Sequence, residues 1–193
     1  MRRWISSSPS TPPGAIALDD LDPRTVESYV GNGAALLIQR AMGEGFSGDE
    51  LARALDFFIH FYRDHSLDHT VFYPGAQGVI RSLASAGIAQ AVLTNKPVRI
   101  SKEILAGLGL GDAFFRVYGG NSFKTKKPDP EGLLRLIEEA ATSPEQTLMV
   151  GDSTVDIQTA RTPAMPQFAG VALLPPARNL SVRPSPDLPG GLF

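Results

Sequence analysis

The chain has 193 residues, of which 42% are hydrophobic and 20% charged, so it can build one domain, or a domain with a small insert, around a sizeable core. Its net charge of −2 argues against a general nucleic-acid-binding protein, and the absence of cysteine excludes disulfides, thiolate zinc sites and cysteine nucleophiles. No apolar run has the length of a membrane span or of a signal-peptide core, so we expect a soluble, cytoplasmic protein with no membrane partner.

The N-terminal part of the chain predicts helices only. Residues 1–14 lack apolar periodicity, so we expect them to be disordered. In residues 15–70 no segment is a convincing strand, and the Ser47-Gly48-Asp49-Glu50 sequence is the capping-box pattern that opens a helix. Apolar side chains recur at helical spacing over 25–30, 34–42 and 47–65. We therefore predict that residues 15–70 form a helical cap subdomain.

From Tyr73 onward, predicted helices and strands alternate. The helices are expected at 76–86, 100–108, 130–141 and 153–161, and the strands at 88–93, 114–118, 147–150 and 169–174. This alternation predicts an α/β fold, a doubly wound, mostly parallel, Rossmann-like sheet with helices on both faces. We assign residues 71–174 to this core and residues 175–193 to an irregular, proline-rich tail.

Polar residues follow two of the predicted strands. Thr94 and Asn95 come directly after the strand that ends at Leu93, and a hydroxyl and an amide can bind phosphate oxygens without adding charge. Taken alone, they fit a turn before a helix better than a phosphate site. The segment from Lys124 to Pro130 carries three lysines, of which at most one is expected to be catalytic while the others are solvated.

A third strand end carries two acids. The apolar run from Leu148 ends in Gly151-Asp152, and Asp156 follows four residues later. Two carboxylates at the end of a buried strand are suited to a hard cation such as Mg²⁺. The same residues also fit a helix N-terminus, with Asp152 or Ser153 as the cap.

Together, in this order and spacing, these segments resemble the motifs of the haloacid dehalogenase-like (HAD) phosphatase superfamily. Thr94-Asn95 resembles the second motif, Lys127 the third, and the segment from Gly151 to Asp156 the fourth. Further segments resemble the phosphoglycolate phosphatases within that superfamily: Tyr29–Ala34, Phe72–Gly75, Thr94–Pro97 and Gly119–Phe123.

The resemblance implies a mechanism for hydrolysing a small phosphorylated metabolite. An aspartate attacks phosphorus and forms an aspartyl-phosphate, which water then hydrolyses. Mg²⁺ is held by that aspartate together with Asp152 and Asp156 and neutralises phosphoryl charge. Thr94, Asn95 and Lys127 would bind the substrate and stabilise charge on the transferring oxygens. We expect a monomer or a homodimer.

The chain departs from the superfamily at the attacking aspartate, because no Asp-x-Asp-Gly-Thr sequence is found. Asp20-Leu21-Asp22 has the Asp-x-Asp form, but Pro23-Arg24 replaces the Gly-Thr pair and the segment lies only eight residues before Val30. We interpret Asp20 as a solvated residue leading into the cap. The core is then expected to lack its first strand, as in a truncated or frame-shifted gene product, a degenerate paralogue or a chain with a misassigned start.

Two alternatives to an active enzyme remain. A non-catalytic remnant or pseudoenzyme could still bind phosphate and Mg²⁺ through Thr94, Asn95, Lys127 and Asp152. A response-regulator-like or nucleotide-binding module is disfavoured, since no glycine-rich phosphate loop follows a strand.

Overall fold

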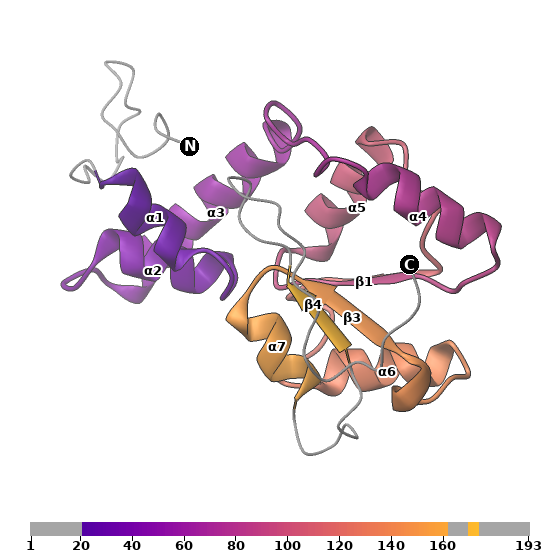
Figure 1. The fold of residues 1–193 in the computed structure, drawn as a ribbon. Coiled ribbons are helices and arrows are strands. Elements are labelled where there is room, and N and C mark those ends of the chain that lie inside the picture. The colour runs from indigo at the N-terminus through magenta and orange to yellow at the C-terminus, as the bar shows by residue number, and fades with distance from the viewer. Residues whose placement is uncertain (1–20, 162–169, 174–193) are drawn as a thin grey trace.

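The computed structural model of the chain describes residues 21–161 and 170–173. The expectations for residues 1–14, Asp20 and residues 175–193 lie outside these ranges. Figure 1 shows a group of helices beside a second part in which strands lie between helices. No described helix combines the length and the apolar composition that crossing a membrane requires.

The helical part consists of α1 (Pro23–Tyr29), α2 (Ala34–Met42) and α3 (Gly48–Asp64). The predicted capping box opens α3: the Glu50 amide donates to Ser47 Oγ at 3.3 Å, and the Ser47 amide donates to Glu50 Oε2 at 2.9 Å. Helices α2 and α3 pack together through a small core of Leu37, Ile38 and Met42 with the partly buried Leu51, Leu55 and Phe58. Among described residues 21–70 there is no strand, as the sequence predicts.

The second part follows the predicted alternation of helices and strands. Figure 1 shows α4 and α5 on one side of the strands and α6 and α7 on the other. Its elements in chain order are α4 (Ala76–Ser85), β1 (Ala91–Leu93), α5 (Val98–Gly107), β2 (Arg116–Tyr118), α6 (Glu131–Glu139), a 3-10 turn (Pro144–Gln146), β3 (Leu148–Gly151), α7 (Thr154–Ala160) and β4 (Gly170–Leu173).

Strand β1 is shorter than predicted because Gly87 and Ile88, which precede it, donate hydrogen bonds to the last turn of α4. The Ile88 amide, predicted to lie in the strand, donates to Leu83 O at 3.0 Å, and the Gly87 amide donates to Ala84 O at 3.0 Å. These bonds close the C-terminus of the helix, and Gly87 takes the positive φ of 74° that such a closure requires. Residues 87–88 therefore belong to the helix end.

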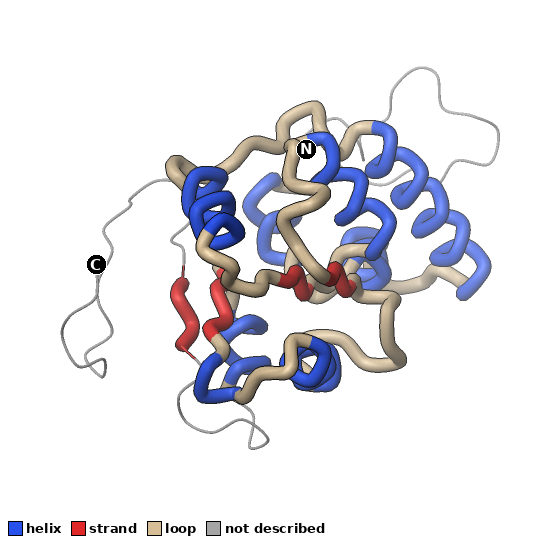
Figure 2. The backbone as a smooth tube through the Cα atoms, turned by 90° about the vertical axis from the view of Figure 1, so that its right-hand side faces the viewer, coloured by secondary structure: helices blue, strands red, loops and turns tan. Residues whose placement is uncertain are grey.

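The strands form two separate parallel pairs, β1 with β2 and β3 with β4 (Figure 2). Helix α6 packs against both pairs, because Leu133 and Ile137 share one apolar cluster with Met149 of β3 and Leu93 of β1. Strands β1 and β3 thus lie under the same helix without being hydrogen-bonded to each other. Each has an unpaired edge within the described residues.

Large apolar side chains are exposed on the elements around this gap. On β3, Leu148 is 64% and Val150 55% exposed, whereas parallel strands are normally buried on both faces. On α4, Val79 and Leu83 are exposed as well. The expectation that the core lacks its first strand stays a prediction, because residues 1–20 lie outside the described ranges.

We expect the purified chain to aggregate, or to melt below the range of about 45–65 °C that is usual for mesophile domains. The physical reason is that unpaired strand edges and exposed apolar faces favour association between chains. Size-exclusion chromatography and a calorimetric scan would test this. A monomer that melts cooperatively within that temperature range would contradict it.

Candidate active site

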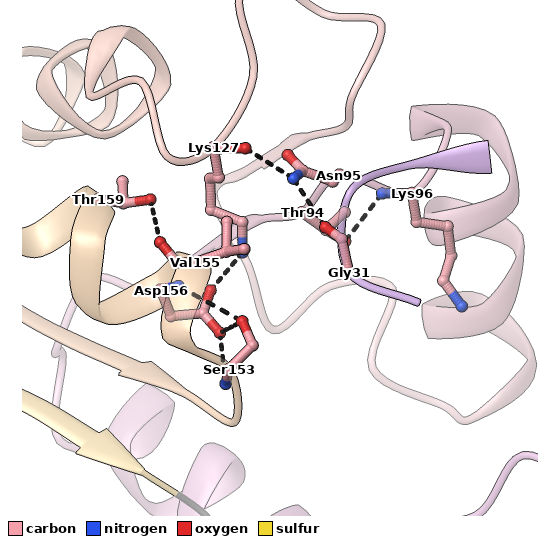
Figure 3. Close-up of polar contacts among 9 residues, drawn as sticks. All are labelled: Gly31, Thr94, Asn95, Lys96, Lys127, Ser153, Val155, Asp156 and Thr159. Carbon is pink, nitrogen blue, oxygen red and sulfur yellow. Dashed lines mark hydrogen bonds and ion pairs between the residues drawn. The ribbon is translucent and has the colours of Figure 1, made fainter. Parts of the chain in front are cut away.

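A buried ion pair joins the second and third predicted site segments. Lys127 Nζ lies 2.6 Å from Asp156 Oδ1, and the two side chains are only 12% and 6% exposed. The loop before α6 supplies the lysine, and the first turn of α7 supplies the aspartate (Figure 3). An ammonium group has three hydrogens, so two remain available to another acceptor.

Asp156 also caps the helix on which it lies. Its Oδ2 accepts hydrogen bonds from the Ser153 amide at 3.1 Å and from Ser153 Oγ at 2.6 Å, which completes a capping box. Burial raises the pKa of the Asp156 carboxyl, but the bonds from Lys127 and Ser153 outweigh it, so this pKa lies below its ordinary value. The carboxylate is therefore ionised and keeps Lys127 in place.

Gly151 is required by the close approach of Asp156. A Cβ atom added at Gly151 would overlap Cβ, Cγ and Oδ2 of Asp156. The end of β3 can lie this near to the first turn of α7 only because residue 151 has no side chain. In the sequence, Gly151 stands out only as part of the motif that ends at Asp156.

Asn95 holds two chain segments together with its side-chain amide. Its Nδ2 donates to Gly31 O at 2.9 Å and to Lys127 O at 2.8 Å (Figure 3). The residue is 7% exposed, and within the described residues its Oδ1 has no hydrogen-bond partner. An unpaired buried acceptor costs about 1–3 kcal/mol, so the two donated bonds fix the orientation of this amide.

Thr94 lies beside Asn95 at the end of β1 and has a free donor. Its Oγ1 accepts a hydrogen bond from the Lys96 amide at 3.1 Å, and its own amide donates to Tyr118 O at 2.9 Å. The loop is fixed further because the Gly120 amide donates to Lys96 O at 2.9 Å. The Thr94 hydroxyl hydrogen has no acceptor among the described residues, so it can be donated to a phosphate oxygen.

Asp152 has an exposed carboxylate at the end of β3, with no hydrogen bond to any described residue. The described residues contain no group of three or more acidic or histidine side chains that could enclose a metal. Mg²⁺ does not need such a group, because it usually keeps several waters and binds one or two carboxylates together with substrate phosphate. Asp152 fits this mode of binding, whereas both oxygens of Asp156 already accept hydrogen bonds.

Contacts between the cap and the core lie near the site, and the sequence did not predict them. Lys126, expected to be solvated, is exposed but donates from Nζ to Asn32 O at 2.7 Å. Lys96 donates to the Tyr62 hydroxyl of α3, and its Nζ lies 4.7 Å from the centre of that ring. The only signal in the sequence was that Lys96 and Asn32 belong to segments that resemble the same phosphatase subfamily.

Comparisons with known proteins agree with the motifs. Residues 16–170 match the haloacid dehalogenase-like hydrolase family. A phosphoglycolate phosphatase from Pseudomonas putida is 39% identical over 141 residues, which cover 70% of this chain and 52% of that protein. Another from Rhodospirillum rubrum is 38% identical over 162 residues, which cover 78% of this chain and 67% of the relative. The chain thus spans about half to two thirds of these relatives.

Solved structures share the fold. A crystal structure of a predicted phosphoglycolate phosphatase from Haemophilus somnus superposes with a TM-score of 0.72 and 27% identity, covering 82% of this chain and 75% of that chain. A β-phosphoglucomutase from Clostridium difficile superposes with a TM-score of 0.64 at 20% identity, covering 76% of this chain and 68% of that chain, and this similarity supports the α/β architecture alone.

Proposed function

The chain belongs to the haloacid dehalogenase-like hydrolase family, and on this premise we propose that its site hydrolyses a small phosphomonoester with the help of Mg²⁺. The fold class and family expected from the ordered motifs are confirmed. Relatives named phosphoglycolate phosphatase support 2-phosphoglycolate as the first substrate to try. The proposal retains the cytoplasmic location and the monomeric or homodimeric state expected from the sequence.

The observation that carries the proposal is the buried Lys127–Asp156 pair. Keeping a lysine at 12% exposure requires a partner, and Asp156 provides it while leaving two ammonium hydrogens free. We assign Lys127 to the phosphoryl oxygens, where its charge offsets the charge of the transferring group. Asp156 acts through Lys127 by fixing its position.

Thr94 and Asp152 complete the proposed site. The Thr94 hydroxyl donates a neutral hydrogen bond to a second phosphoryl oxygen. Asp152 would hold Mg²⁺, which would neutralise phosphoryl charge and orient the phosphate. Asn95 contributes by fixing the main chain at Lys127, because both hydrogens of its amide are already donated to backbone carbonyls.

The proposed mechanism also needs an attacking carboxylate. The resemblance assigns this step to an aspartate, and the one candidate in the sequence, Asp20, lies outside the described residues. Turnover therefore distinguishes a hydrolase from a protein that only binds phosphate, since phosphate binding needs only Thr94, Lys127 and Asp152.

We expect the purified chain to release phosphate from 2-phosphoglycolate and from an aryl phosphate only when Mg²⁺ is present. The Asp152→Ala variant should lower the rate on the order of 100-fold or more, because it removes the proposed metal ligand. Asp112→Ala is a matched control, since Asp112 is an exposed aspartate on the loop before β2. Equal rates in both variants would point to a contaminating phosphatase and overturn the assignment of Asp152.

One observation favours the non-catalytic alternative. Among the described residues, strands β1 and β3 are hydrogen-bonded neither to each other nor to a common strand. A folded sample that binds inorganic phosphate in the presence of Mg²⁺, but releases none from either ester, would support a binding protein in place of a hydrolase. A sample that neither binds nor releases phosphate would contradict both readings.

A further inference from the structure

The segment between α1 and α2 touches both loops that carry the proposed phosphate-binding residues. We name Gly31–Gly33 the hinge segment, because it separates α1 from α2 and its two glycines have positive φ values of 115° and 90°. It leads from α1 into α2, and so into the part of the cap that packs against α3. Its main-chain carbonyls face the core and accept hydrogen bonds from it.

The first connection to the hinge segment runs through Asn95. One buried amide nitrogen donates to Gly31 O at 2.9 Å and to Lys127 O at 2.8 Å, so a single rigid group links the hinge segment to the residue proposed to bind phosphate (Figure 3). The amide cannot exchange these partners for others, since both of its hydrogens are in use. A shift of Gly31 must therefore either break one bond or move Lys127.

The second connection runs through Lys126, the neighbour of Lys127. Its Nζ donates to Asn32 O at 2.7 Å, and an ideal Cβ atom at Gly33 would lie 3.1 Å from the same nitrogen. The two connections come from different loops of the core and end on adjacent carbonyls of the hinge segment. They restrain both the position and the tilt of the segment.

We propose that Asn95 and Lys126 form a clamp that couples the position of the cap to the position of Lys127. Asn95 is a positioning residue in this clamp, and it makes no phosphate contact through its side chain. The inference rests on the proposed function only in that Lys127 binds phosphate; the link between cap and core stands on the contacts themselves. Binding of phosphate at Lys127 then restricts the positions that the cap can take. By reciprocity, a cap held in the position that the structure shows raises the affinity for phosphate by the same factor by which phosphate favours that position.

The absence of cysteine allows a direct test. Two cysteines introduced by Glu44→Cys on the cap and Lys102→Cys on α5 would carry spin labels at exposed positions, and pulsed electron resonance would give the cap-to-core distance distribution. The distribution is recorded with and without inorganic phosphate and Mg²⁺, and calorimetry gives the phosphate dissociation constant. In the unsubstituted background, phosphate should narrow the distribution.

Asn95→Ala should broaden the distribution without phosphate, abolish the narrowing, and weaken phosphate binding at least about tenfold. Lys126→Met replaces an exposed side chain and leaves the buried Asn95 amide intact, and it should also broaden the distance distribution. This variant replaces Asn95→Ala in the test if Asn95→Ala does not fold. Asn32→Ala is the matched control, because it removes a hinge amide side chain with no described partner and keeps the carbonyl acceptor. Thermal melts identify variants that fail to fold.

The clamp is overturned if a folded Asn95→Ala or Lys126→Met chain gives the distribution and phosphate affinity of the unsubstituted background. It is also overturned if the distribution broadens while phosphate affinity stays unchanged, since this indicates a purely structural role. If the unsubstituted background binds no phosphate, the proposed function fails. In that case the cap-to-core distance distribution alone tests the link between cap and core. A distribution of unchanged width in Asn95→Ala would refute the link.

Discussion

The Asp156→Ala variant is expected to lose about 3–5 kcal/mol of unfolding free energy, the range found when one partner of a buried ion pair is removed. Lys127 Nζ, now 2.6 Å from Asp156, would be left buried without its counter-charge. The helix would also lose its cap, because Asp156 Oδ2 accepts two bonds from Ser153. Urea unfolding followed by circular dichroism measures the change, and phosphate affinity should fall in the same sample.

Two further variants separate the ion pair from the cap. Ser153→Ala removes the capping hydroxyl only and should cost about 0.5–2 kcal/mol. Asp156→Ala combined with Lys127→Met removes both charges, so it should be more stable than Asp156→Ala alone. If Ser153→Ala and Asp156→Ala cost the same, the buried pair contributes nothing to stability and the lysine is solvated.

The same carboxylate makes stability depend on pH in a defined direction. The folded pKa of Asp156 lies below its ordinary value, while an unfolded aspartate titrates near about 3.9. The stabilisation is therefore complete above the unfolded pKa and is lost as the pH falls through the lower, folded pKa. Acid titrations of the unfolding free energy should be steeper below about pH 4 for the unsubstituted chain than for Asp156→Asn.

Gly151→Ala is expected to be strongly destabilising for so small a substitution. The added methyl group would overlap three atoms of Asp156, so β3 or α7 must shift. Overpacking of this kind typically costs about 1–3 kcal/mol, and displacement of Asp156 should add part of the loss expected for the ion pair. Thermal unfolding and phosphate binding should both be affected.

Gly78→Ala provides the control for this substitution. Gly78 lies within α4, and a Cβ atom there would have nothing within 4 Å. Alanine should stabilise the helix by up to about 1 kcal/mol, since glycine is the poorer helix former. A Gly151→Ala chain as stable as Gly78→Ala would mean that the close approach of β3 and α7 is not required.

Local patterns in the sequence predicted most of the fold, because local interactions produce it. The Ser47 capping box acts over three residues, and the alternation of apolar segments sets the order from α4 to β4. Of the proposed site, the sequence predicted only that polar residues lie at or near the ends of strands. Side-chain spacing does not reveal that Lys127 pairs with Asp156 across 29 residues, or that Asn95 reaches Gly31 across 64. Those contacts exist only after the chain has folded.

The contacts of Lys126 and Asn95 illustrate the same limit. Lys126 was expected to be solvated because at most one of the three lysines was expected to be catalytic. It is exposed, and it also donates to a carbonyl of the hinge segment. Asn95 was expected to face phosphate, because its amide follows a strand end, yet both of its hydrogens are donated to main-chain carbonyls. In both cases a backbone carbonyl far away in the sequence accepts the hydrogen bond, and the spacing of residues along the chain does not reveal it.

Within the part of the chain that the structure describes, β1 and β3 each have an unpaired edge, and this has a consequence for the protein in a cell. Unpaired strand edges beside the exposed Leu148 and Val150 are the kind of surface that chaperones bind and that quality-control proteases detect during transient opening. Fast degradation would then lower the steady-state amount of the chain. Turnover measured after blocking translation should accordingly be fast, and it should slow when a cellular protease is inhibited.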